Sequence, residues 1–277
     1  MLQCGSLDSM NKTFHYLSGL PRSGNTVVSS LLNQNPNVYS SGLSPVCEYL
    51  WILSQSALSQ ENVIRNKNRS RSDFVFSNLL NNYYADINKP IVFDREKNWG
   101  TPANLSLIKT YFTKEPKIVY TVRPVVEILT SFLSLDTAWI DRSMNNNNWN
   151  YKSYLTQDDN RCDYLMRAYG EIDQGLLVLN EVLKPENKDV FCVVEYSDLI
   201  NNPQDTMDNI YKFIGLKSFV HNFNSIKKLE VDDDMAIGLP KDLHKVRPQL
   251  NKTSLKPKDV LSDYILGKYS NLEFWRK

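Results

Sequence analysis

The 277-residue chain lacks a strong charge of either sign and lacks a long uninterrupted apolar run. Its 32 lysines and arginines face 31 aspartates and glutamates, which leaves a formal net charge of +1. This balance argues against a polybasic surface for nucleic acid or anionic lipid, although a local anion site remains compatible with it. No window approaches about 18 consecutive apolar residues, so we expect no membrane span.

Paired cysteines are also missing. The four cysteines are scattered without a CxxC pair: Cys4, Cys47, Cys162 and Cys192. This spacing favours neither a zinc site nor a disulfide framework. The first residues have neither the basic start nor the apolar stretch of a secretory signal. We therefore expect reduced thiols, no bound metal and a cytoplasmic protein.

The composition is that of a globular protein, with 42% apolar and 23% charged residues. At about 150 residues per domain, the length allows one large domain or two smaller ones. The 10 glycines and 12 prolines are dispersed, so no linker divides the chain. We expect a single domain over residues 1–277, with residues 1–12 disordered or peripheral.

Apolar runs alternate with segments of helical periodicity. The runs predict four buried strands, at 14–18, 91–93, 117–122 and 190–194. The periodic segments predict helices at 26–33, 45–58, 73–87, 125–135, 162–183 and 203–214. This order indicates an α/β fold with a P-loop-type parallel sheet flanked by helices on both faces. Ligands of such sheets bind beyond the carboxyl ends of the strands, so the residues there are the first candidates for a site.

The segment after the first strand, GLPRSGNT at 19–26, nearly matches the phosphate loop G-x-x-x-x-G-K-[ST]. Asn25 replaces the lysine of that motif, and Arg22 supplies a cation three residues earlier. Gly24 lets the backbone approach an anion, while the following helix N-terminus and the Thr26 hydroxyl add donors. A loop without the lysine suits a triphosphate poorly and fits a shorter anion with one phosphate and one further leaving group.

A second cation and hydroxyl follow the strand at 117–122. Arg123 stands at its carboxyl end, Pro124 occupies the first turn of the next helix, and Ser131 lies eight residues after Arg123. Because eight residues make a little over two helical turns, Ser131 returns near the face on which the helix begins. Arginine with a hydroxyl can hold a phosphate. Two anion sites on one sheet edge form a more specific pattern than either motif alone.

These motifs, with a third, resemble those of the PAPS-dependent sulfotransferases, whose donor is 3′-phosphoadenosine 5′-phosphosulfate (PAPS). The loop at 19–26 is similar to their 5′-phosphosulfate loop in its LPRSG form, which is typical of a bacterial and phage-borne branch. RPVVEILTS at 123–131 is similar to their 3′-phosphate motif. Residues 194–216 resemble their Y-E-D-L…P…FLG segment, with Ser197 in place of an acidic residue. The resemblance runs from residue 15 to 216, and more loosely to Arg247.

The resemblance implies a nucleotide held at both ends. Arg123 and Ser131 would hold the 3′ phosphate, and Tyr196 matches a residue that lies beside the adenine. Lys245 and Arg247 fall where relatives fold a basic loop over the nucleotide, although exposed charges explain them equally well. The residues implied for the 5′ phosphosulfate are Arg22, Ser23, Gly24, Asn25 and Thr26.

Sulfuryl transfer needs a general base within hydrogen-bond reach of the acceptor hydroxyl. The cytosolic branch of the family has a histidine after the strand that matches 91–93, where this chain reads DREKNW. The heparan-type branch has a Glu-Lys pair there, so a carboxylate is the natural substitute. We place Asp94 first because it follows the expected strand directly. Glu96 and Glu48 come next, since Glu48 lies in the segment where the tyrosylprotein branch carries its catalytic glutamate.

Positive charge is expected near the reacting atoms. Lys97 or Arg95 would stabilise the bridging oxygen and the moving sulfuryl group, and Arg22 would add charge from the loop. Of the three histidines, only His244, beside the late basic residues, is a candidate for ligand contact. No metal is required for this chemistry.

The acceptor side is less defined. Residues 136–160 are rich in Trp, Tyr and Asn, which suits either a mobile lid over a sugar or aryl acceptor or an ordered loop with its aromatics packed inward. The leading hypothesis is a PAPS-dependent sulfotransferase that acts on a small-molecule, glycan or peptide acceptor. Two alternatives stay open: a Mg-dependent P-loop kinase with Asp94 as a metal ligand, and an inactive nucleotide-binding homologue. The missing loop lysine counts against the kinase.

Overall fold

The computed structural model describes residues 12–61, 65, 69–135, 157–228, 236, 244–250 and 255–276. The expected peripheral segment at 1–12 and the expected lid at 136–160 lie outside these ranges, except for residues 12 and 157–160. Within the described ranges, every helix is too short or too polar to cross a membrane.

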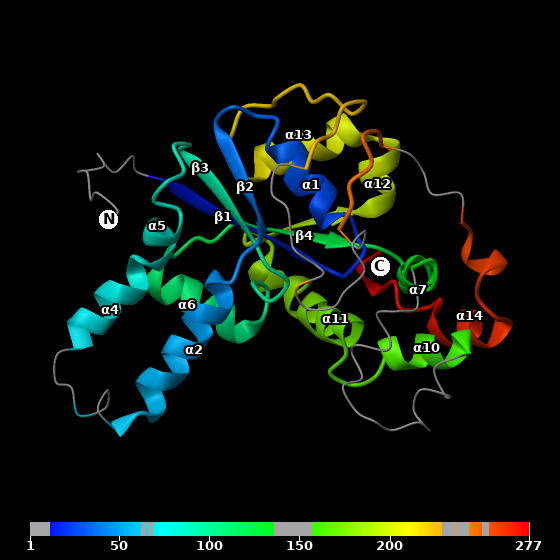
Figure 1. Ribbon diagram of the computed structural model, residues 1–277, viewed down its shortest axis with the longest axis horizontal. Coiled ribbons are helices and arrows are strands. Elements are labelled where there is room, and N and C mark those ends of the chain that lie inside the picture. The colour runs from blue at the N-terminus through cyan, green and yellow to red at the C-terminus, as the bar shows by residue number, and fades with distance from the viewer. Residues whose placement is uncertain are drawn as a thin grey trace.

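A five-stranded sheet forms the centre of the molecule, with strand order β2-β3-β1-β4-β5 and parallel pairing throughout (Figure 1). The strands are β1 (Thr13–Gly19), β2 (Val38–Leu43), β3 (Ile91–Arg95), β4 (Ile118–Val122) and β5 (Phe191–Glu195). The parallel α/β fold and four of the strands are confirmed predictions. The edge strand β2 was missed because serines and a glycine interrupt its apolar pattern.

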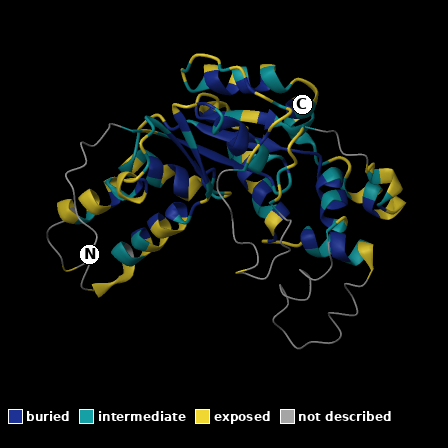
Figure 2. Ribbon diagram, turned by 45° about the horizontal axis from the view of Figure 1, so that its top comes forward, coloured by how far each residue is buried: buried dark blue, intermediate teal, exposed yellow. Residues whose placement is uncertain are grey.

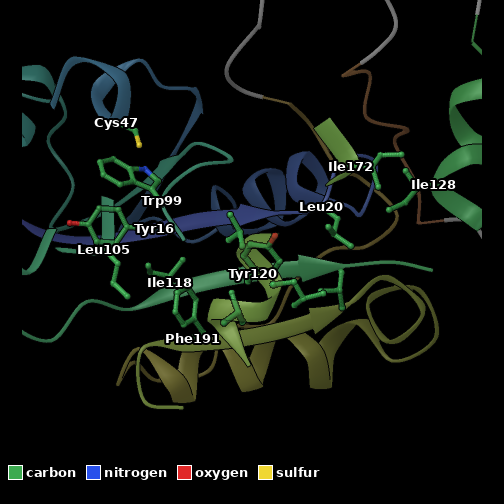
Figure 3. Packing of buried hydrophobic residues seen from close by; sticks show 14 of the residues in the cluster. Tyr16, Leu20, Cys47, Trp99, Leu105, Ile118, Tyr120, Ile128, Ile172 and Phe191 are labelled. Atoms are coloured by element: carbon green, nitrogen blue, oxygen red, sulfur yellow. The ribbon is translucent and has the colours of Figure 1, made fainter. Parts of the chain in front are cut away.

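Successive residues of each strand face opposite layers, and each layer is apolar. In β1, Tyr16 belongs to one buried cluster and Leu17 to the other; in β4, Tyr120 and Val119 divide in the same way. Figure 2 shows the sheet as a buried centre beneath helices whose outer faces are exposed. In the first cluster, drawn in Figure 3, the ring of Tyr16 packs against Trp99 at 4.8 Å between centroids.

Helices cover both faces of the sheet (Figure 1). The Leu17 layer is covered by α1 (Asn25–Leu32), α12 (Tyr196–Asn201) and α13 (Pro203–Phe213). The Tyr16 layer is covered by α2 (Val46–Ser59), α6 (Pro102–Tyr111), α7 (Val125–Leu133), α10 (Asp158–Leu165), α11 (Glu171–Val182) and α14 (Asp263–Tyr269). The remaining elements are α4 (Arg69–Ser77), α5 (Leu79–Tyr83) and the short 3-10 turns η1 (Pro185–Asn187), η3 (Pro257–Asp259) and η4 (Phe274–Arg276).

Two predicted helices are wrong in extent. The one expected at 162–183 is two helices, α10 and α11, separated by a turn in which Tyr169 has a φ of 62°. Gly170 closes that turn, because a Cβ there would meet the carbonyl oxygen of Arg167 at 2.8 Å. The one expected at 73–87 begins earlier and divides into α4 and α5. Helices α6, α12 and α14 were not predicted.

Candidate active site

A cleft of about 1080 Å³ opens at the carboxyl edge of the sheet. Its walls come from the segments that follow β1, β3, β4 and β5, together with the start of α2, the turn before α11 and residues 244–250. Sites for drug-sized ligands measure roughly 300–1,000 Å³. The cleft therefore lies slightly above this range and is large enough for a nucleotide-sized ligand.

The loop between β1 and α1 forms one end of this cleft. Gly24 has a φ of 102°, and a Cβ there would lie 3.1 Å from the ring of Tyr196, so glycine suits both the backbone and the packing. The backbone of Arg22 also has a left-handed conformation, with a φ of 58°. Helix α1 begins at Asn25 without a side-chain cap, so the amide groups of its first turn are available to an anion.

The two hydroxyls of this loop have different surroundings. The Ser23 side chain is buried, and its Oγ lies 2.5 Å from the carbonyl oxygen of Leu20 and 2.5 Å from Thr121 Oγ1. Only the Ser23 backbone amide is therefore placed to serve a ligand. Thr26 lines the cleft, and its Oγ1 accepts a hydrogen bond of 3.1 Å from Arg95 Nη1.

Arg123 forms the centre of the other end of the cleft, and it is only 6% exposed. Its Nε lies 3.0 Å from Glu127 Oε2, and its Nη1 donates to the backbone oxygen of Arg22 at 3.1 Å. The guanidinium also stacks over the ring of Tyr196, 4.2 Å from the centroid. These contacts fix the orientation of both side chains. The structure thus brings into contact Arg123 and Tyr196, which were candidates from two separate motifs.

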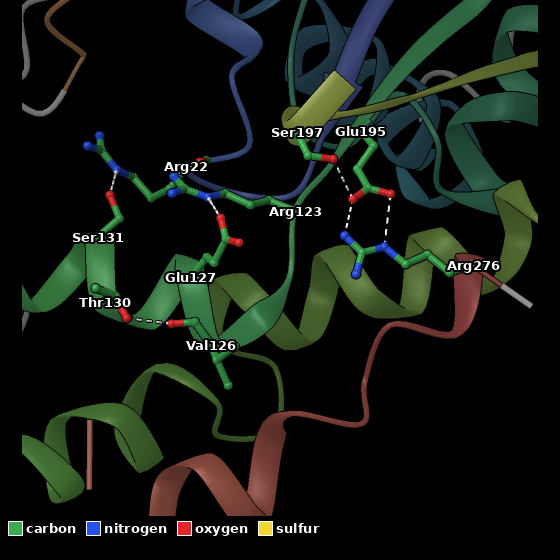
Figure 4. A network of polar contacts seen from close by, with 9 residues as sticks. All are labelled: Arg22, Arg123, Val126, Glu127, Thr130, Ser131, Glu195, Ser197 and Arg276. Carbon is green, nitrogen blue, oxygen red and sulfur yellow. Dashed lines mark hydrogen bonds and ion pairs between the residues drawn. The ribbon is translucent and has the colours of Figure 1, made fainter. Parts of the chain in front are cut away.

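The side chain of Arg22 joins the two ends. Its Nε donates to Ser131 Oγ on α7 at 3.1 Å, although the residues are 109 positions apart (Figure 4). Arg22 was predicted to serve the 5′ end alone. Its backbone belongs to the loop after β1, but its guanidinium lies beside the hydroxyl predicted for the 3′ phosphate.

Three charged candidates for the chemical step line the cleft. Glu48, in the first turn of α2, is exposed to the cleft. Lys97 is exposed, and its Nζ lies 3.1 Å from Glu171 Oε1. Glu96 is half-buried and accepts hydrogen bonds from the backbone and side-chain nitrogens of Asn98. Burial raises the pKa of Glu96, while the Asn98 amide and the Lys97 charge oppose that rise.

Asp94 is not placed to act as the base, so ranking it first among the candidates is corrected. It is fully buried and does not line the cleft. Its Oδ2 accepts from Ser44 Oγ at 2.6 Å and Tyr84 Oη at 2.7 Å, and its Oδ1 accepts from Trp99 Nε1 at 2.7 Å. Burial raises the pKa of Asp94, and the three donors partly offset this effect. The same contacts count against Asp94 as a magnesium ligand in the kinase alternative.

The late basic residues also reach the cleft. His244, Lys245 and Arg247 all line it, in the described segment 244–250. The backbone around them is tied to the body of the protein, because the Ile226 amide donates to the Pro248 oxygen at 2.7 Å. Their role in holding a nucleotide stays a prediction.

Several contributors to the cleft were not predicted, among them Glu127, Arg167 and Tyr169. Glu127 pairs with Arg123, and this pair could have been predicted because Glu127 follows Arg123 by four residues at the start of a helix. Arg167 and Tyr169 line the cleft from the turn between α10 and α11. Gly170 was the signal for that turn, but the apolar periodicity on both sides concealed it.

The fold and the cleft define an α/β protein in which two arginine-bearing segments meet in one cleft at the carboxyl edge of a parallel sheet. The chain belongs to the sulfotransferase family, whose model matches residues 16–220. The match includes the loop at 19–26, the segment 123–131 and the segment 194–216. The predicted family is confirmed and the protein is a sulfotransferase, while the LPRSG-type branch stays a prediction. The donor typical of this family is PAPS.

Three solved structures were compared with the chain, and the first, with a TM-score above 0.5, shows a similar fold. The sulfotransferase domain of the Synechococcus PCC 7002 olefin synthase is 16% identical, with 99% of this chain and 98% of that chain covered and a TM-score of 0.52. A sulfotransferase from Alicyclobacillus acidocaldarius has 11% identity, 76% and 84% coverage and a TM-score of 0.48. Sulfotransferase STF9 from Mycobacterium avium has 14% identity, 95% and 77% coverage and a TM-score of 0.47. No curated protein sequence matches the chain.

Proposed function

We propose that this sulfotransferase moves a sulfuryl group from PAPS to a hydroxyl or amine of its acceptor. The observation that carries the proposal is the hydrogen bond from Arg22 to Ser131, which joins the two anion-binding ends in one cleft. A donor with a phosphosulfate at one end and a phosphate at the other matches that arrangement. A nucleoside triphosphate, with all its phosphates at one end, leaves the second site unused.

The donor lies across the cleft in this proposal. Amides of the loop from Ser23 to Thr26, including those of Gly24 and Asn25, hold the 5′ phosphosulfate at the N-terminus of α1. Arg123 and Ser131 hold the 3′ phosphate, with Arg22 between the two ends. The adenine lies near Tyr196, and Lys245 and Arg247 close over the nucleotide.

The chemical step is an in-line displacement at sulfur. The acceptor oxygen forms the new S–O bond while the bond from sulfur to the bridging oxygen of the 5′ phosphate breaks. The acceptor proton passes to a carboxylate, for which Glu48 and Glu96 are the candidates because both line the cleft. Lys97, Arg22 and Arg95 stabilise the charge that develops on the sulfuryl and phosphate oxygens. The products are the sulfated acceptor and adenosine 3′,5′-bisphosphate.

The acceptor is a small molecule, a glycan or a peptide. The cleft is larger than the nucleotide requires, which leaves space for its reactive part. We also propose a cytoplasmic protein, in line with the free thiols of the described cysteines Cys47, Cys162 and Cys192.

Calorimetry with two ligands tests the donor assignment. We expect adenosine 3′,5′-bisphosphate to bind tightly and ATP with Mg²⁺ to show no binding. A Ser131→Ala variant should bind the bisphosphate more weakly, because it lacks one donor to the 3′ phosphate. Tight binding of ATP with Mg²⁺ and none of the bisphosphate would overturn the proposal in favour of the kinase.

Transfer itself is tested with PAPS labelled in its sulfur. Carbohydrate, phenolic and peptide pools are offered separately, and label in a product that is lost in a Glu48→Gln, Glu96→Gln double variant supports the proposed chemistry. Label transfer that survives in this double variant would refute the carboxylate base. Donor binding without transfer to any pool would favour the inactive homologue.

A further inference from the structure

Arg95 is a buried arginine at the point where β3 meets the cleft. Its side chain lines the cleft, yet the residue is only 4% exposed. Its backbone is fixed on both sides, because its amide donates to Ser41 Oγ at 2.9 Å and its oxygen accepts from the Ser44 amide at 2.9 Å. A strand residue held in this way presents its guanidinium with little freedom.

The guanidinium of Arg95 determines the hydrogen-bonding role of the Thr26 hydroxyl. Arginine can only donate, so the 3.1 Å contact from Nη1 makes Thr26 Oγ1 an acceptor. A hydroxyl has one proton, and in the described part of the chain the hydroxyl of Thr26 has no acceptor for it. Ser30 Oγ bonds to the backbone oxygen of Thr26 and does not involve the hydroxyl.

We propose that Arg95 is a positioning residue that turns the Thr26 hydroxyl into a dedicated donor to the 5′ end of the sulfuryl donor. The inference rests on the proposed function, because it assumes an anion beside Thr26. Arg95 lowers the number of orientations open to the hydroxyl, so the hydrogen bond to the anion forms with little rotational loss. Its positive charge also strengthens that hydrogen bond.

The neighbouring hydroxyl shows that this orientation is not a general property of the loop. Ser23 Oγ is engaged with Leu20 and Thr121 inside the protein, so it has no proton to offer a ligand. At the other end of the cleft the arrangement recurs, because Arg22 Nε donates to Ser131 Oγ at 3.1 Å. Each anion-binding end thus has one hydroxyl whose acceptor position is filled by an arginine from elsewhere in the chain.

The test compares two ligands that differ only at the 5′ end: adenosine 3′,5′-bisphosphate and adenosine 3′-monophosphate. Arg95→Gln should lower the affinity for the bisphosphate at least about tenfold, since a charge-assisted hydrogen bond is lost. It should change the affinity for the monophosphate less than twofold. Arg95→Lys keeps the positive charge but lacks the planar guanidinium, so the loss of bisphosphate affinity should be intermediate. Arg71→Gln, at an exposed arginine of α4 that does not line the cleft, is the matched control and should leave both affinities unchanged.

A double-mutant cycle separates orientation from simple charge. Thr26→Val should weaken bisphosphate binding, whereas Thr26→Ser should preserve it. When Arg95→Gln is added to Thr26→Val, the further loss of bisphosphate affinity should be smaller than the loss that Arg95→Gln causes alone. These Thr26 variants leave the buried arginine in place, so they test the hydroxyl even if Arg95→Gln fails to fold.

Three outcomes would overturn the inference. One is an equal loss for both ligands in Arg95→Gln, as expected of a structural role. The others are independent, additive effects of Arg95 and Thr26, and full bisphosphate affinity in Thr26→Val. Failure of the unmodified protein to bind the bisphosphate would instead refute the donor assignment, and this inference with it.

Discussion

The proposed donor end and the proposed acceptor side of the cleft are built in different ways. At the donor end, charged side chains are held by other parts of the protein before any ligand arrives. Arg22 donates to Ser131 across 109 residues of sequence, and Arg95 donates to Thr26 from a buried strand. Groups held in this way lose little freedom on binding, which favours tight and geometrically selective recognition.

On the acceptor side the charges are more accessible. Glu48 is exposed on the first turn of α2, and Lys97 pairs with Glu171 where both side chains are more than half exposed. Such a pair contributes little to stability. In the proposed function, the prearranged end selects the donor, while the exposed charges of the other wall meet the acceptor.

The largest effect is expected at the base. Glu48→Gln or Glu96→Gln should lower kcat by about 10²–10⁴-fold, because a glutamine cannot take the acceptor proton. Affinity for adenosine 3′,5′-bisphosphate should stay within about twofold, since neither carboxylate is placed to hold the donor. Steady-state kinetics and calorimetry measure the two quantities. A variant that loses donor affinity and kcat together would break the division between the two sides.

The pH profile then assigns the role. Burial raises the pKa of Glu96 above its ordinary value of 4.5. A base must be ionised to act, so with Glu96 as the base the rate should rise with pH through that raised pKa. The lower limb of the profile would then lie above the range of an ordinary glutamate, and Glu96→Gln would remove it. A limb that survives in Glu96→Gln would assign the base to Glu48.

The next effect concerns Asp94, which belongs to the fold rather than to the chemistry. Asp94→Leu would leave the donors of Ser44, Tyr84 and Trp99 unpaired, at about 1–3 kcal/mol each, and should lower the free energy of unfolding by about 3 kcal/mol or more. Asp94→Asn should fold, because its oxygen can accept from Trp99 while the two hydroxyls turn to accept from its amide. Urea unfolding measures both changes.

The pH dependence of stability checks the same assignment. Because burial raises the pKa of Asp94 above 3.8, the folded protein binds this proton more tightly than the unfolded chain does. Its contribution to stability should therefore be present at low pH and be lost as pH rises from about 4 through the raised pKa. Asp94→Asn should lack this loss. A stable Asp94→Asn variant with no activity would contradict the structural role and return Asp94 to the chemistry.

Much of the donor end could be predicted from the sequence because its parts are continuous segments. The loop at 19–26 and the segment at 123–131 each follow a recognisable strand, so their place at the sheet edge follows from the topology. The contact between Arg22 and Ser131 could not be predicted in this way. It depends on the left-handed conformation of Arg22 and on the packing of α7, which no local pattern reveals.

The error at Asp94 came from the length of one strand. The apolar run ends at Phe93, but β3 continues to Arg95 and pairs Asp94 with Tyr16 and Arg95 with Leu17. Side chains alternate along a strand, so Asp94 enters the layer that contains Tyr16, whereas Arg95 turns towards α1 and Thr26. A two-residue difference in strand length therefore placed Asp94 in the core and left Arg95 at the cleft.

A smaller effect on donor binding is expected at Arg123. Arg123→Met should weaken adenosine 3′,5′-bisphosphate about 100-fold, because a buried guanidinium held by Glu127 and Tyr196 offers charge-assisted hydrogen bonds to a phosphate. Arg167→Met removes an exposed arginine that also lines the cleft, so it serves as the control and should leave this affinity nearly unchanged. Equal losses in both variants would show that net charge in the cleft, rather than a prearranged site, determines donor binding.

The smallest effect is expected at the C-terminal turn η4, where Arg276 pairs with Glu195 just before Tyr196 (Figure 4). The Arg276 side chain is 43% exposed, so Arg276→Gln should lower the free energy of unfolding by less than about 1 kcal/mol. Hydrogen bonding to Arg276 lowers the pKa of Glu195. The contribution of this ion pair to stability is therefore present above about pH 4.5 and should be lost as pH falls through the lowered pKa. Thermal unfolding at pH 7 and pH 3 can measure this loss.

The affinity of the Arg276→Gln variant for the bisphosphate should change less than twofold, because Arg123 holds the Tyr196 ring independently. A larger loss would extend the prearranged donor end to the C-terminal turn.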